Sequence, residues 1–80
     1  MSPFEQKKLD LEFERFVSRH FEKPRNCRNL DQIRLYVGEL SVKIREFKQS
    51  FNYVPDQAYT LLSKYNELQN SMIYAEFRNA

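Results

Sequence analysis

The two side chains with the most reactive chemistry, one thiol and one imidazole, lie close together in the sequence. Cys27 stands between Arg25 and Arg28, and positive neighbours lower the pKa of a thiol and favour its reaction as a nucleophile. His20 has no second histidine beside it, so Cys27 and His20 supply only half of a tetrahedral zinc site. We interpret Cys27 as an ordinary loop cysteine and His20 as a packed or boundary residue of a helix, and we expect no metal site.

No other residues in the sequence form a pattern that indicates an enzyme. Glu14 forms acidic pairs with Asp10 and Glu12 in a mixed-charge segment, where we expect nothing to bury these carboxylates and shift their pKa values. Gly38 is the only glycine, which excludes the glycine-rich loops that bind phosphate groups. We therefore expect a protein without catalytic activity, cofactor or small-molecule substrate.

A basic run joins the first two predicted helices. Residues 19–28, RHFEKPRNCR, contain four cations near a single acidic residue, and these cations are Arg19, Lys23, Arg25 and Arg28. Such a loop can bind the phosphate backbone of a nucleic acid, although cations also favour the C-terminal end of a helix because of its dipole. The net charge of +2 lacks the strong basic excess of a dedicated nucleic-acid binder. Nucleic-acid association through this loop is therefore our alternative hypothesis.

The clearest functional signal is a second apolar stripe in residues 30–47, LDQIRLYVGELSVKIREF. The main stripe has the spacing of a helix packed against another helix, and it consists of Leu30, Ile33, Val37, Leu40, Ile44 and Phe47. Leu35 and Val42, with Gly38 between them, fall on the opposite side of the same helix. We name Leu35, Gly38 and Val42 the outer stripe. A glycine at its centre allows another helix to approach closely.

Apolar residues also lie behind the main stripes of the first and third predicted helices. A group of exposed apolar residues on neighbouring helices marks a surface for a protein partner, although a first helix that covers the outer stripe would explain it equally well. We favour a small interaction or regulatory module that binds another protein or a second copy of itself, with no membrane role. The predicted partner-binding residues are Leu35, Gly38, Val42, Tyr59, Ile73 and Phe77.

Three helices must position these residues, and their boundaries follow from capping residues and prolines. Ser2 with Glu5, and Asn29 with Gln32, have the spacing of capping boxes that begin helices. Pro24 disfavours helical geometry in the preceding residue. With a break at FNYVPDQ, the predicted helices cover residues 3–23, 30–50 and 55–77.

The second break is short, so its flanking helices are expected to form an antiparallel hairpin. Asn52 is a suitable C-terminal cap and Pro55 suits the first turn of the next helix. The predicted fold is an all-α antiparallel three-helix bundle built on this hairpin, as a single domain over residues 1–80. We expect a core containing Phe13, Phe16, Phe21, Phe47 and Phe51, flanked by Tyr36, Tyr59 and Tyr74.

A chain of 80 residues is close to the smallest size at which one apolar core offsets chain entropy. With one cysteine it cannot gain stability from an internal disulfide, so association with another chain is a natural source of extra stability. The N-terminal segment is charged and has no apolar core of a signal peptide. We therefore expect a cytoplasmic location.

Overall fold

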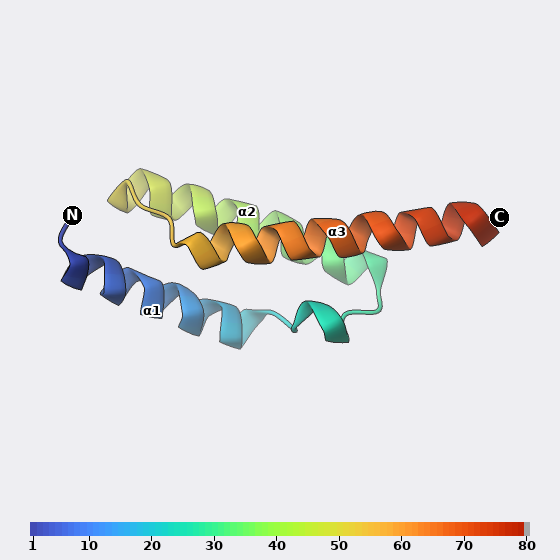
Figure 1. Ribbon diagram of the computed structural model, residues 1–80, viewed down its shortest axis with the longest axis horizontal. Helices are drawn as coiled ribbons and strands as arrows, with labels where there is room; N and C mark the ends of the chain where they lie inside the picture. The colour runs from blue at the N-terminus through green and yellow to red at the C-terminus, as the bar shows by residue number, and fades with distance from the viewer. Residues whose placement is uncertain (80) are drawn as a thin grey trace.

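The computed structural model describes the backbone of residues 1–79 and the surroundings of side chains through residue 76. All regular structure in this part of the chain is helical, which confirms the predicted all-α class. Figure 1 shows three long helices side by side, with α2 running opposite to α1 and α3. The elements are α1 (Pro3–His20), the short 3-10 helix η1 (Pro24–Asn26), α2 (Leu30–Phe51) and α3 (Asp56–Asn79).

Side-chain caps begin α1 and α2 at the predicted positions. The Ser2 hydroxyl accepts a hydrogen bond from the Glu5 amide at 3.2 Å. The Asn29 side-chain oxygen accepts from the amides of Asp31 at 2.8 Å and Gln32 at 3.3 Å. Each cap satisfies amides that have no partner inside the helix, which fixes where the helix starts.

The first helix ends at His20, three residues earlier than predicted. Phe21 is the C-cap and has an extended backbone. Its ring packs against Tyr36 at 5.0 Å and Tyr65 at 6.2 Å between ring centroids, and the Tyr65 hydroxyl donates to the carbonyl of Glu22. These contacts with the other two helices require the chain to leave helical geometry before Pro24.

The α2–α3 hairpin is the tightly packed part of the molecule. Asn52 ends α2 in the left-handed conformation, with φ of 51°, and its amide donates to the Lys48 carbonyl. Asn tolerates this conformation better than most residues, as predicted for the cap. Ile33 and Leu40 of α2 are fully buried, as are Ala58 and Tyr65 of α3.

Helix α1 packs on this hairpin mainly through large side chains. Close backbone approaches are concentrated between α2 and α3, with α1 farther away. The Phe13 side chain reaches from α1 to the hairpin and is fully buried. Its ring lies edge-on to the ring of Phe47, with 5.4 Å between the ring centroids. Less than one turn before Phe13, the Asp10 side chain accepts a hydrogen bond from the Tyr53 hydroxyl at 2.7 Å, and the Asp10 carbonyl accepts one from the Gln57 side chain at 2.8 Å.

The aromatic core differs in part from the prediction. Phe13 and Phe47 are buried, and Phe16 and Phe21 are half-buried. Phe51 was predicted to be a core residue but is 42% exposed, because it lies in the last turn of α2, at the end of the bundle. Tyr36 was predicted to flank the core but is buried within it, where its hydroxyl accepts from Gln32 at 3.0 Å.

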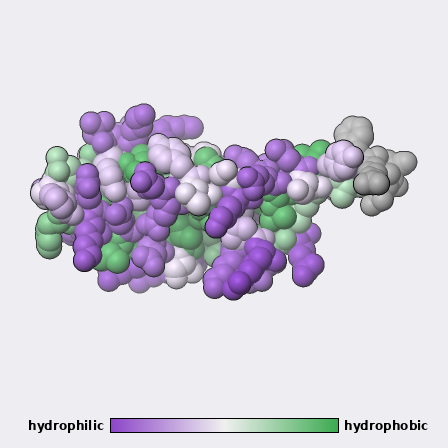
Figure 2. Space-filling model, in the orientation of Figure 1, coloured by the Kyte–Doolittle hydropathy of each residue, from purple (hydrophilic) through white to green (hydrophobic). Residues whose placement is uncertain are grey.

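The bundle is elongated, with extents of 52 × 20 × 16 Å. Hydrophilic residues predominate on the face shown in Figure 2, with apolar residues visible between them. Among residues 1–79, none of the helices combines the length and the apolar character that crossing a membrane demands.

Candidate docking groove

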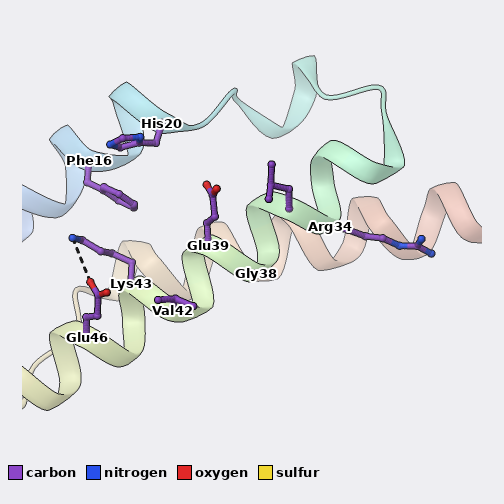
Figure 3. Close-up of a pocket in the computed structure, with 9 residues that line it drawn as sticks. Phe16, His20, Arg34, Gly38, Glu39, Val42, Lys43 and Glu46 are labelled. Atoms are coloured by element: carbon purple, nitrogen blue, oxygen red, sulfur yellow. Dashed lines mark ion pairs between the residues drawn. The ribbon is translucent and has the colours of Figure 1, made fainter.

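The outer stripe of α2 lines an open groove between α1 and α2. This groove has a volume of about 690 Å³. Its apolar surface comes from Phe16 of α1 and from Leu35, Gly38 and Val42 of α2. In Figure 3, Phe16 projects from α1 toward α2. The first helix therefore forms one wall of the groove and does not cover the outer stripe.

Charged residues surround this apolar surface. They are Arg34, Glu39, Lys43 and Glu46 of α2, with His20 of α1 beside them. The Lys43 ammonium lies 3.6 Å from a Glu46 carboxylate oxygen and 4.7 Å from the Phe16 ring centroid, as Figure 3 shows for the ion pair. Lys43 of α2 thus contacts Phe16 of α1 through a cation–π interaction. Its charge is paired with that of Glu46 on the same helix.

Phe16 and His20 are groove residues that sequence reasoning assigned otherwise. His20 was expected to be packed or at the boundary of the core; it is exposed, and its ring lies 4.7 Å from Phe16. Phe16 also contacts Phe13 at 6.2 Å and Phe21 at 5.5 Å, so its ring links the core to the groove. The spacing of Phe16 and His20, four residues apart on α1, was the available signal for a shared face.

Among the residues that the structure describes, no other part of the chain packs against Gly38. A Cβ atom added there would meet no heavy atom within 4 Å. Glycine in a helix interior costs about 1 kcal/mol of stability relative to alanine. The packing of the bundle does not require glycine here, so alanine at this position would make the bundle alone more stable. The open space above Gly38 belongs to the groove.

The predicted partner-binding residues lie partly in the groove and partly on α3. Leu35 is 57% exposed and Val42 is 48% exposed, and both lie in the groove with Gly38. Tyr59 and Ile73 both belong to α3 and do not line the groove. Tyr59 is 49% exposed, and Ile73 is half-buried. The side chain of Phe77 lies outside the described residues.

The basic residues of the alternative hypothesis all lie at the α1–α2 connection. Their side chains are exposed, and they are Arg19, Lys23, Arg25 and Arg28. Contact with phosphate groups requires exposed basic side chains, but the basic side chains of any solvated loop are exposed as well. Nucleic-acid association stays a prediction, which salt-dependent binding lost in an Arg25→Ala, Arg28→Ala variant would test.

Cys27 lies in the connection between α1 and α2, as predicted, but its side chain belongs to the core. Its side chain is 3% exposed, and the thiol faces the carbonyls of Lys23 at 3.5 Å and Glu22 at 3.9 Å. Burial raises the pKa of the Cys27 thiol, and the Glu22 carboxylate raises it further. The expected lowering by the neighbouring arginines is therefore wrong, because their exposed charges are solvated while the thiol is not.

Comparisons of this chain with protein-family models, with curated proteins and with solved structures find no match. The class that the observations define is thus an all-α bundle with an apolar groove between α1 and α2.

Proposed function

We propose that this protein is a small non-catalytic interaction module that binds a helix of a protein partner in the groove between α1 and α2. The observation that supports the proposal is the exposure of Leu35 and Val42 in a concave apolar site. Burial of apolar surface contributes about 25 cal/mol for each Å² removed from water. A helix that covers the outer stripe gains this free energy without any change of the bundle.

Concavity separates the groove from an exposed apolar pair on α1. Phe4 and Leu11 are also exposed and also seven residues apart, on the outer side of α1. Neither of them lines the groove, which Leu35 and Val42 share with Phe16. A site walled by two helices contacts a bound side chain from two directions, which is typical of helix-in-groove recognition.

The charges around the groove are suited to orienting a partner. Glu39 and Arg34 are exposed at its edges, while Lys43 is paired with Glu46. Charged residues around an apolar centre contribute to orientation and association rate more than to affinity. We further expect the module to act in the cytosol, where a reducing environment keeps an unpaired thiol such as Cys27 stable.

The test is a double variant, Leu35→Glu with Val42→Glu, compared with the matched control Phe4→Glu with Leu11→Glu. Both variants place two carboxylates seven residues apart on an exposed helix side and change the net charge equally. Proteins retained from native cell extract by wild type are expected to be lost with the groove variant and kept with the control. Circular dichroism checks that both variants keep wild-type helicity.

A groove variant that remains helical and retains every protein that wild type retains would show that the groove is not the binding site. Equal loss with both variants would also contradict the proposal, since added charge alone would then explain it.

A further inference from the structure

We infer that the groove and outer stripe receive a second copy of this chain, with the two α2 helices crossing antiparallel at Gly38. This inference rests on the proposed function and specifies its partner. The order of charged and apolar residues along the exposed side of α2 is complementary to the same order read in reverse.

The residues concerned are centred on Gly38. Asp31 precedes Gly38 by seven residues and Arg45 follows it by seven, while Leu35 and Val42 lie three before and four after. At 3.6 residues per turn, all five fall within about 80° of one side of the helix. A two-fold axis at Gly38 therefore places Asp31 opposite Arg45 of the second copy, and Leu35 opposite its Val42.

The charges of Asp31 and Arg45 favour an antiparallel direction for the second helix. A parallel pair would place Asp31 against Asp31 and Arg45 against Arg45, which is unfavourable, whereas the antiparallel pair forms two opposite-charge contacts. Asp31 and Arg45 are both exposed. The single ion pair within the described part of the chain joins Lys43 to Glu46, so neither Asp31 nor Arg45 is engaged in one.

Gly38 allows the close approach that this crossing needs. Nothing lies within 4 Å of a Cβ placed there, so the backbone of α2 is accessible at the crossing point. Helices that meet at glycine approach more closely than helices that meet at larger residues. The apolar contacts of Leu35 with Val42 then lie on both sides of the axis, and each is flanked by one charge pair.

The size of the contact predicts a reversible dimer. Asp31 and Arg45 are fourteen residues apart, so the paired helices meet over about 21 Å. This length places the buried area toward the lower end of specific interfaces. The monomer and dimer are therefore expected to exchange with protein concentration.

Reversal of charge provides the sharpest test, using the full purified chain in sedimentation velocity over a range of concentrations. Wild type is expected to shift from the monomer mass to twice that mass as concentration rises. In a two-fold dimer, Asp31→Arg creates two Arg–Arg contacts and Arg45→Asp creates two Asp–Asp contacts. Each single variant is expected to dimerise at least tenfold more weakly than wild type, because it replaces two attractive contacts with two contacts between like charges.

The two single variants should dimerise with each other when they are mixed. An equimolar mixture of Asp31→Arg and Arg45→Asp chains pairs every Arg with an Asp across the interface, so the mixture is expected to dimerise, as is the doubly reversed chain. Misfolded variants would not recover on mixing, which separates lost association from lost structure. Asp56→Arg is the matched control, because Asp56 also lies in the first turn of a helix, and it is expected to dimerise like wild type.

A wild-type chain that stays monomeric at every concentration would overturn the inference, as would a single reversal without effect or a mixture that remains monomeric. If the pure protein is monomeric while a different protein binds it and is lost with the Leu35→Glu, Val42→Glu variant, the proposed function stands and the second copy is excluded. If the reversals and the groove variant leave an observed dimer unchanged, the second copy binds elsewhere and the inference fails, while the proposed function is decided by the capture experiment alone.

Discussion

The two sides of α2 carry apolar residues at the same spacing but have opposite surroundings. Ile33, Leu40 and Phe47 follow one another at intervals of seven residues and are buried against the other helices. Leu35 and Val42 are also seven apart, yet about half of each side chain is exposed. Spacing therefore identifies a face that can pack against a helix, while the position of the other helices decides whether the chain itself covers that face.

The position of α1 explains the difference. Phe13 and Leu9 of α1 reach the core, so the inner side of α2 is closed by α1 and α3 together. Phe16, less than one turn further along α1, extends over the side of α2 and leaves the outer stripe uncovered. The groove is thus a consequence of packing α1 at a distance, through large side chains.

The largest expected difference between the two sides is in stability. Leu40→Ala should lower the free energy of unfolding by about 2–5 kcal/mol, because it leaves a cavity in a fully buried site. Leu35→Ala should change it by no more than about 0.5 kcal/mol when measured on dilute monomer. Urea unfolding followed by circular dichroism gives both values. Similar losses at the two positions would show that the chain covers both sides of α2.

A smaller effect of opposite sign is expected at Gly38. Gly38→Ala should raise the free energy of unfolding of the monomer by about 1 kcal/mol, since alanine favours the helix and the added methyl group meets open space. Ser63→Ala, at an exposed position of α3, serves as control with a gain of about half that size. A destabilised Gly38→Ala monomer would mean that Gly38 is in fact covered within the chain.

The weakest expected effect concerns the contact that places α1, one wall of the groove. The hydrogen bond to Asp10 raises the pKa of Tyr53 to about 12. Because the folded state favours the protonated hydroxyl, this contribution to stability is complete below pH 10 and is lost as the pH rises through 12. Tyr53→Phe should remove that part of the pH dependence, seen as a difference between variant and wild-type unfolding curves from pH 9 to 12. Identical slopes in the two proteins would exclude a folded-state role for this contact.

Local signals made most of the fold predictable. Ser2, Asn29 and Asn52 cap helices at the expected positions because capping depends on neighbouring residues alone. The antiparallel hairpin followed from the short connection between α2 and α3. The end of α1 was not predictable in this way, since the contacts of Phe21 with Tyr36 and Tyr65 join residues distant in the sequence.

The candidate site was predictable on one helix and not on the other. Leu35, Gly38 and Val42 were identified because their spacing contradicts the main stripe of their own helix. Phe16 and Cys27 were not, because an aromatic residue on an apolar face resembles any core residue, and a thiol in a basic segment gives no sign of its burial. Their environments depend on the angle at which α1 and its connection meet the hairpin.

The loose attachment of α1 has a consequence for the motions of the molecule. Elements with few close neighbours open locally before the rest of a protein unfolds, so backbone amides of α1 should exchange with solvent deuterium sooner than those at the centres of α2 and α3. Such an opening would release Phe13 from Phe47 and widen the space beside the outer stripe. The same wide spacing that creates the groove thereby makes its α1 wall the part of the bundle that can adjust to whatever is bound.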